Sequence, residues 1–254
     1  MLMKFLFITC LLVASHSANA SLITHSGYTR AEASDIVSGN GLEWLMWDQT
    51  ANMSISQALE AHTAQGWRLA SNLDMAVLFN AFQFGKTDWS GAENLGQVAY
   101  TPWQLSEVSP HNAFTSLFGS TFNSALCDGP YPSSWCDGYA ANDPLILAQA
   151  FYGSDDDQDG FYKSALVYDD FSYALQNNND KVDGYAVLRA ASWSPDAQSL
   201  SYGVALVRSA SAVAVSAPAS LGLFIIALML LAFLRRSTLG GNNSLLSHKA
   251  KVEL

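Results

Sequence analysis

An acidic cluster at residues 155–160 is the part of the sequence whose spacing most directly suggests chemistry. It reads Asp-Asp-Asp-Gln-Asp-Gly, and the pattern D-x-D-x-D-G places Asp155, Asp157 and Asp159 at alternate positions before a glycine. Carboxylate oxygens at this spacing, followed by a glycine that permits a sharp turn, are typical of calcium-binding loops. We therefore expect a Ca²⁺ site with these three aspartates as ligands.

The same loop lacks the residue that usually completes a twelve-residue calcium site. The closing acidic ligand would fall at position 166, where the chain has Leu166, so Asp169 or Asp170 would have to replace it. A site with this ligand missing should bind weakly, in roughly the 10⁻⁴–10⁻³ M range of extracellular modules. The alternative interpretation is a solvated acidic turn between two strands.

The cysteines favour a disulfide over a metal site. Cys127 and Cys136 are separated by eight residues, and the third cysteine, Cys10, lies in a segment that we expect to be removed. An isolated pair in an exported protein usually forms a disulfide, whereas a zinc site would need two more ligands. We expect Cys127 to be linked to Cys136.

The sequence contains no catalytic motif that assigns an enzyme class. There is no G-x-S-x-G, no H-E-x-x-H and no phosphate-binding loop. We expect His62 and His111 at helix surfaces or caps. Two carboxylates that are distant in sequence can still meet in space and cleave glycosides, but the spacing selects no pair among the available glutamates, Glu43, Glu60, Glu93 and Glu107.

Charge and aromatic content limit the partners of the chain. Residues 21–218 hold 21 acidic and 7 basic residues, which leaves a formal charge of −14. Such a body repels phosphate backbones, so we expect no nucleic-acid partner, and it suits divalent cations or neutral ligands. Extracellular polysaccharide is one such ligand if tryptophans stack on sugar rings, although large aromatics more often belong to the core. The candidates near polar loops are Trp89, Trp103, Trp135 and Trp193.

The N-terminal end has the three regions of a secretory signal. Lys4 supplies the positive start, residues 5–13 form an apolar stretch, and Ala18 and Ala20 flank one residue in a small-x-small cleavage site. Nine residues are too few to span a hydrocarbon layer of about 30 Å. We therefore expect residues 1–20 to be a signal peptide that is cleaved after Ala20.

The C-terminal end has the features of a transmembrane helix. Residues 219–234 carry no charge and are followed at once by Arg235 and Arg236. Sixteen residues give about 24 Å of helix, and the uncharged linker, residues 209–218, can lengthen the span. Because positive residues favour the cytoplasmic side, we expect a single-pass inner-membrane protein with its body in the periplasm and the basic tail, residues 235–254, in the cytoplasm.

The order of these C-terminal features resembles the PEP-CTERM sorting signal of exported bacterial proteins. In that family a Val-Pro-Glu-Pro-like motif precedes a short hydrophobic helix and an arginine cluster. Val215 and Pro218 match the motif, whereas Ser216 and Ala217 replace its proline and glutamate, and the tail after Arg236 is longer than usual. The resemblance implies processing by an exosortase-type protease and release to the cell surface or extracellular matrix.

We expect residues 21–208 to form one domain of α+β class, with helices in the first half and an antiparallel sheet in the second. These elements must position the acidic loop. Ser54 or Ser56 can cap the first helix and Ser71 the second, with Gly66 placed to end the first and Pro110 to open a third. The last two expected strands resemble one another and are candidates to pair. The expected strands are 21–30, 41–48, 67–70, 145–152, 161–168, 185–189 and 202–208.

Three short segments of this domain also resemble a known family. Gly-Leu-Glu-Trp-Leu at 41–45, Gly-Trp-Arg-Leu-Ala at 66–70 and Val-Arg at 207–208 are similar to domains of Lcl-type bacterial surface proteins, which are related to the C-type lectin fold. The resemblance implies a surface-binding role without catalytic residues. We therefore expect an exported, membrane-tethered surface or matrix protein that binds without catalysis, and the alternative is a polysaccharide hydrolase of the envelope.

Overall fold

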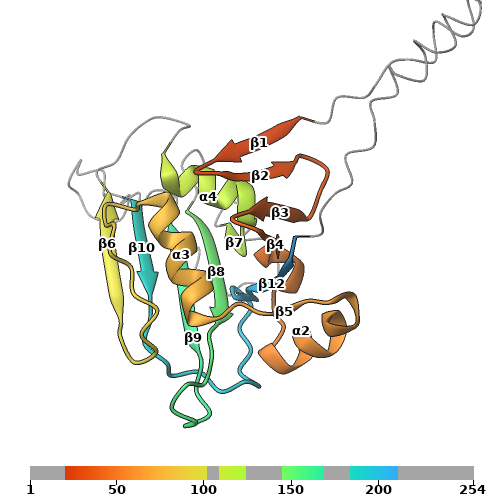
Figure 1. Ribbon diagram of the computed structural model, residues 1–254, viewed down its shortest axis with the longest axis vertical. Coiled ribbons are helices and arrows are strands. Elements are labelled where there is room, and N and C mark those ends of the chain that lie inside the picture. Colours follow the sequence, from red (N-terminus) through yellow and green to blue (C-terminus); the bar gives the residue numbers. More distant parts are fainter. Residues whose placement is uncertain (1–20, 102–108, 124–144, 169–183, 211–254) are drawn as a thin grey trace, which may run out of the picture. The chain divides into compact units, whose positions relative to one another are not determined.

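A computed structural model describes residues 21–101, 109–123, 145–168 and 184–210 (Figure 1). The chain divides into two units, Met1–Ala210 and Ser211–Leu254, and the second lies outside the described residues. The described part of the first unit is an α+β domain with three α-helices and two sheets, which confirms the expected fold class. Within the described ranges, no helix has the length and apolar character needed to cross a bilayer.

The first sheet, sheet A, is antiparallel throughout. Its first two strands form a hairpin that turns at Ser26 and Gly27, whose φ angles are 52° and 80°, as a two-residue primed turn requires. The single strand expected over residues 21–30 was therefore wrong, because this Ser-Gly turn interrupts it. The strand order is β1 (Leu22–His25), β2 (Tyr28–Ala31), β3 (Ile36–Gly39), β4 (Leu42–Leu45), β12 (Leu206–Ser209) and β5 (Arg68–Leu69).

The second sheet, sheet B, is antiparallel except where β11 runs parallel to β8. Its order is β11 (Gly203–Val204), β8 (Ile146–Tyr152), β9 (Lys163–Tyr168), β10 (Gly184–Leu188) and β6 (Gln97–Thr101), and β7 (Phe122–Asn123) also pairs with β8.

The two sheets correct two expectations about the strands. The strand expected over 202–208 divides into β11 and β12, which join different sheets, so its expected pairing with β10 was wrong. Helices do occupy the first half, but the first half also supplies β1 to β6. The separation into a helical half and a sheet half was therefore too simple.

Helix boundaries follow the capping residues expected from the sequence. Ser54 and Ser71 are N-caps with complete capping boxes, and Gly66, at φ 82°, ends the turn after the first helix. Pro110 occupies the first turn of the third helix, where its missing N–H costs nothing. The helices are α2 (Ile55–His62), α3 (Asn72–Phe82) and α4 (Pro110–Phe118), with 3₁₀ turns η1 (Trp47–Thr50) and η2 (Thr63–Gln65).

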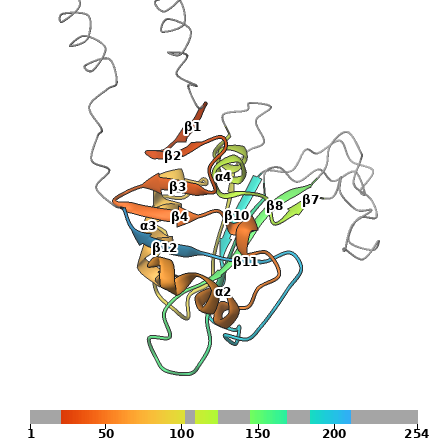
Figure 2. The same ribbon diagram turned by 90° about the vertical axis from the view of Figure 1, so that its right-hand side faces the viewer.

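One apolar core joins the helices to both sheets. Phe79 and Phe82 of α3 and Phe114 and Phe118 of α4 are almost fully buried, and Phe114 lies 5.0 Å from Phe82 between ring centroids. The same cluster includes residues of β4, β8, β9, β10 and β12. In Figures 1 and 2, α3 and α4 lie against sheet B beside the strands of sheet A. Fully burying each such ring contributes roughly 1.5–3 kcal/mol, so this cluster fixes the two sheets and the helices together.

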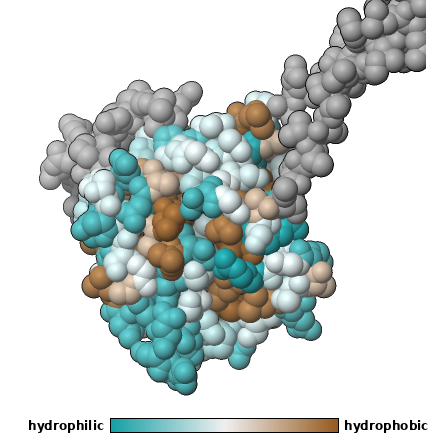
Figure 3. All heavy atoms as spheres, viewed as in Figure 1, coloured by the Kyte–Doolittle hydropathy of each residue, from teal (hydrophilic) through white to brown (hydrophobic). Residues whose placement is uncertain are grey.

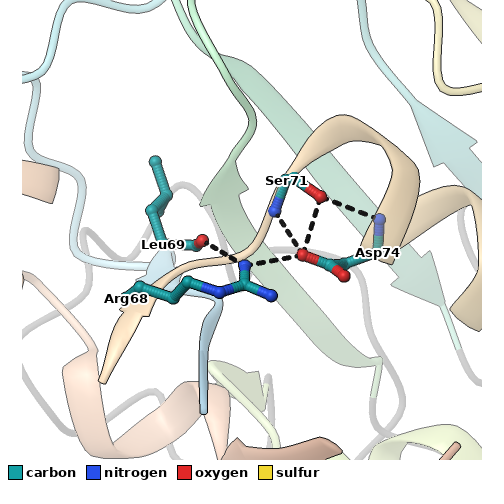
Figure 4. Close-up of polar contacts among 4 residues, drawn as sticks. All are labelled: Arg68, Leu69, Ser71 and Asp74. Atoms are coloured by element: carbon teal, nitrogen blue, oxygen red, sulfur yellow. Dashed lines mark hydrogen bonds and ion pairs between the residues drawn. The ribbon is translucent and has the colours of Figure 1, made fainter. Parts of the chain in front are cut away.

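The junction between β5 and α3 is closed by one carboxylate (Figure 4). Asp74 Oδ2 accepts hydrogen bonds from Arg68 Nη1 at 2.7 Å, Ser71 N at 2.9 Å and Ser71 Oγ at 2.7 Å. Arg68 also donates to the Leu69 carbonyl oxygen. Partial burial raises the pKa of Asp74, but the hydrogen bonds from Arg68 and Ser71 outweigh it, so the pKa lies below its usual value of 3.8.

Replacing Asp74 with Asn should destabilise the domain by about 1 kcal/mol at neutral pH, because the charge-assisted bonds are lost. Since the folded-state pKa lies below the unfolded value of 3.8, this stabilisation is present above that pH and is lost as the pH falls through the folded-state pKa. The check is the free energy of unfolding in urea from pH 7 to pH 3 for the wild type and Asp74→Asn. Asp88→Asn, at an exposed ion pair, is the control and should change little. A difference for Asp74→Asn that stays constant down to pH 3 would contradict this assignment.

Candidate metal centre

The structure brings the three predicted aspartates together and adds a fourth carboxylate. Asp155, Asp157 and Asp159 lie in the loop between β8 and β9, and each offers a carboxylate oxygen that lies within 4.8 Å of the others and of one from Glu93. In Figure 1 this loop lies at the lower end of sheet B, where the chain also enters β6, and Figure 3 shows that end as a hydrophilic tip. We refer to these four residues as the carboxylate cluster.

The loop is held in its turn by its own carboxylates. Asp155 Oδ2 accepts from the Gly160 N–H at 3.1 Å, and Asp159 Oδ1 accepts from the Phe161 N–H at 2.8 Å. Asp157 Oδ1 accepts from the Asp159 N–H at 3.2 Å. Gly160 has a φ of 82°, a conformation that glycine adopts without steric cost. The glycine of the sequence pattern therefore makes the sharp turn that the pattern predicted.

Glu93 is the buried member of the cluster and comes from a different part of the chain. It precedes β6, and only 7% of its surface is exposed. Its Oε2 accepts from the backbone N–H groups of Asp156 at 2.9 Å and Asp157 at 3.1 Å, while its buried Oε1 has no hydrogen-bond partner among the described residues. Because an unpaired buried carboxylate oxygen is costly, this atom points to a ligand that the protein itself does not supply.

Asparagine side chains attach the loop to the rest of the fold. Asn72, at the first position of α3, donates to the Ser154 carbonyl oxygen at 3.1 Å and to Asp156 Oδ2 at 3.0 Å. Asn94 donates to Asp157 Oδ2 at 2.8 Å. At Gly153, a β-carbon would lie 2.7 Å from Asn72 Oδ1, so the close approach requires glycine. The loop is therefore fixed to α3 and to the segment before β6.

A buried lysine lies under the segment that carries Glu93. Lys163, the first residue of β9, is fully buried, and its Nζ donates to the carbonyl oxygens of Ala92 at 2.5 Å, Glu93 at 2.8 Å and Leu95 at 3.0 Å. Burial lowers the pKa of Lys163 to about 8, against the opposing influence of Glu93. The ammonium form therefore predominates at neutral pH.

The cluster has the ligand type and spacing of a site for a hard divalent cation. Oxygens that each lie 2.3–2.6 Å from Ca²⁺ can be at most about 4.6–5.2 Å apart, and the four oxygens meet this condition. Two carboxylates at such a distance repel each other by about 1 kcal/mol in water and by more when partly buried. The arrangement could hold a metal ion that relieves this repulsion.

The fourth carboxylate differs from the one that the sequence suggested. Leu166, at the position of the usual closing ligand, is completely buried in β9, and Asp169 and Asp170 lie outside the described residues. The fourth carboxylate oxygen near the three aspartates belongs to Glu93, 62 residues before Asp155 in the chain. Nothing in the local pattern around Glu93 indicates a ligand, so the sequence alone did not identify it.

Comparison with protein-family models, with curated proteins and with solved structures finds no match for this chain. The function of the chain is therefore inferred from its own residues. Many of the predicted site residues lie outside the described ranges, namely Cys127, Cys136, Ala18, Ala20, Val215, Pro218, Arg235 and Arg236.

Glu43, Glu60 and His111, which were also considered for catalysis, have other surroundings, and Glu107 lies outside the described ranges. Glu43 forms an ion pair with Arg208 at 2.6 Å, and Glu60 is exposed on α2. The expectation that His111 lies at a helix surface or cap was wrong, because it is buried on α4, whose N-cap is Ser109, with its ring 4.9 Å from that of Phe84. Burial lowers the pKa of His111 to about 4, so it is a neutral core residue at physiological pH.

The tryptophans considered for sugar stacking contribute to packing where they are described. Trp89 is buried against Phe79, with 5.1 Å between ring centroids. Trp193 is half-buried and packs on Phe151 and Tyr202. Trp103 and Trp135 lie outside the described ranges. An exposed aromatic side chain that sequence reasoning missed is Tyr100, on the edge strand β6, with 59% of its surface exposed.

Calcium should stabilise the wild-type chain, and Glu93→Gln should remove most of this effect while keeping the side chain's size and its acceptor for the Asp156 and Asp157 N–H groups. At ten times the dissociation constant, binding adds about 1.4 kcal/mol to the free energy of unfolding. The measurement is thermal unfolding of the full-length chain in millimolar Ca²⁺ and in chelator. Asp157→Ala should behave like Glu93→Gln, and Glu60→Gln, on the exposed side of α2, should respond like the wild type. Equal responses of Glu93→Gln and the wild type would exclude Glu93 as a ligand.

Proposed function

We propose that this chain is an exported, membrane-tethered protein of the cell surface or extracellular matrix that binds without catalysis and carries a Ca²⁺ ion in its carboxylate cluster. The observation that carries the proposal is Glu93, a nearly buried carboxylate with an unpartnered oxygen beside three aspartates. An ion at this point joins the β8–β9 loop to the segment before β6. Calcium is then a structural component of the binding surface.

The exposure of the cluster fits calcium levels outside the cell. Asp157 and Asp159 are exposed, so part of the ion's coordination shell is left to water. Such sites bind in roughly the 10⁻⁴–10⁻³ M range that is typical of extracellular modules. A site of this affinity fills where calcium is millimolar, which agrees with a body in the periplasm or beyond.

Export and attachment rest on the two ends of the chain. The proposed signal peptide, residues 1–20, and the proposed membrane helix, residues 219–234 with Arg235 and Arg236, support a single-pass inner-membrane topology. The PEP-CTERM-like order of the C-terminal features supports processing by an exosortase-type protease. An oxidising compartment would also allow the proposed disulfide between Cys127 and Cys136.

Extracellular polysaccharide is the ligand class that we propose for the domain. Tyr100 and Tyr185 are directly opposite on β6 and β10, and their rings stack with centroids 5.5 Å apart. They alternate with the buried Ala99 and Ala186, so they lie on the face of sheet B opposite the core. An exposed tyrosine offers both a flat apolar ring and a hydroxyl group, which suits a neutral sugar.

The alternative, a polysaccharide hydrolase, has less support. Glycosidases use two carboxylates with room for the scissile bond between them, at about 5–5.5 Å or 6.5–9.5 Å. In the cluster, four residues each offer a carboxylate oxygen, and these oxygens converge within 4.8 Å of one another, while Glu43 is engaged by Arg208. Four converging carboxylates suit a cation better than an acid–nucleophile pair.

Binding and hydrolysis can be separated with one panel of neutral and acidic polysaccharides. We expect the full-length chain to be retained by at least one of them in millimolar Ca²⁺, without release of reducing ends. Tyr100→Ala should weaken retention several-fold with an unchanged unfolding midpoint. Leu22→Ala, at a similarly exposed side chain on β1, is the matched control. Release of reducing ends by the wild type would favour the hydrolase instead.

The proposed topology predicts opposite results for two reporter fusions in a Gram-negative host. A reporter that is active only outside the cytoplasm should be active when fused after Ala210, because the body is exported. It should be inactive when fused after Leu254, because the basic tail is retained in the cytoplasm. Activity of the second fusion would contradict the single-pass arrangement.

A further inference from the structure

Lys163 and Glu93 both connect the β8–β9 hairpin to residues 92–95. Lys163 extends from the hairpin to that segment, and Glu93 extends from the segment to the hairpin. Lys163 belongs to the β8–β9 hairpin, where it pairs with Tyr152 at the base of the acidic loop, and its ammonium group donates to carbonyl oxygens of Ala92, Glu93 and Leu95. Glu93 extends back into the hairpin and accepts from the N–H groups of Asp156 and Asp157. We refer to this reciprocal arrangement as the Lys163–Glu93 clasp.

The ammonium group of Lys163 is fully used by the backbone. An ammonium has three N–H donors, and here each reaches one carbonyl oxygen within 3.0 Å. No carboxylate oxygen is among these three partners, so the bonds define the path of the main chain at residues 92–95. That path determines where the Glu93 side chain begins, and hence whether its carboxylate reaches the loop.

We propose that Lys163 is a positioning residue of the cation site, which holds the backbone of residues 92–95 so that Glu93 is delivered as its buried fourth ligand. This inference rests on the proposed calcium site. Without the ammonium, the Leu95 carbonyl oxygen loses this donor, and those of Ala92 and Glu93 keep only long bonds from the N–H groups of Leu95 at 3.4 Å and Ala191 at 3.3 Å. More of the ordering of the segment then has to come from the ion itself. The free energy of that ordering is then subtracted from the free energy of calcium binding.

A positioning role and a simple charge effect predict opposite changes in calcium affinity when Lys163 is removed. If Lys163 acted only through its positive charge, removing that charge would strengthen the binding of a cation nearby. If Lys163 positions Glu93, removing it weakens binding. The direction of the change in calcium affinity therefore separates the two roles.

The test is the dissociation constant of the full-length chain for Ca²⁺ alone, measured by calorimetry. We expect Lys163→Met to weaken binding at least tenfold and Glu93→Gln to weaken it similarly. The double variant should bind no more weakly than Glu93→Gln, because Lys163 acts through Glu93, and such non-additivity is what a double-mutant cycle measures. Lys86→Met, at a lysine that pairs with Asp88, is the control and should leave the dissociation constant unchanged.

Unchanged or tighter binding by Lys163→Met, or additive losses in the double variant, would overturn the inference while leaving the calcium site in place. Absence of calcium binding by the wild type would overturn both. If Lys163→Met does not fold, Lys163→Gln retains a neutral donor group, and we expect it to lose at least threefold in affinity. Acetylation of Lys163 in the wild type gives a further measurement: calcium should slow it at least threefold, and an unchanged rate would overturn the inference.

Discussion

The aromatic core between the helices and the two sheets is the constraint on which the remaining structure depends. Phe82, Phe114 and Phe118 contact one another and residues of both sheets. Because protein interiors are closely packed, these rings fix the position of α3 relative to sheet B. The first residue of α3, Asn72, in turn holds the acidic loop through Ser154, so the geometry of the cluster originates in the core.

The carboxylate cluster combines exposed carboxylates with a nearly buried one. The three aspartates are solvated or half-buried and could exist without a partner, whereas Glu93 is nearly buried and cannot be solvated fully. Its backbone hydrogen bonds to the loop and the nearby Lys163 ammonium offset part of the cost of burial. The unpaired buried oxygens of Glu93 and Asp155 are what distinguish this loop from an ordinary acidic turn.

Short patterns in the sequence predicted the features that depend on contacts between residues close together in the chain. Ser54, Ser71, Gly66 and Pro110 identified the three helices because caps and turns are decided within a few residues. The three aspartates were likewise found from their spacing. Glu93 was not, because its selection depends on tertiary contacts formed across more than 60 residues. The division of residues 202–208 between two sheets was missed for the same reason, since the hydrophobic pattern continues through both strands.

Completion of sheet A depends on strand β12, which comes from the last residues of the domain. It lies between β4 and β5 in sheet A, and its Arg208 pairs with Glu43 across 165 positions of sequence. Before β12 pairs with them, β4 and β5 each have an unpaired edge. Contacts between residues so far apart in sequence form slowly. Exposed strand edges are templates for association with other chains. A chain that is truncated or stalled before residue 206 therefore exposes the strand edges of β4 and β5, and its tendency to aggregate depends on how quickly β12 pairs with them.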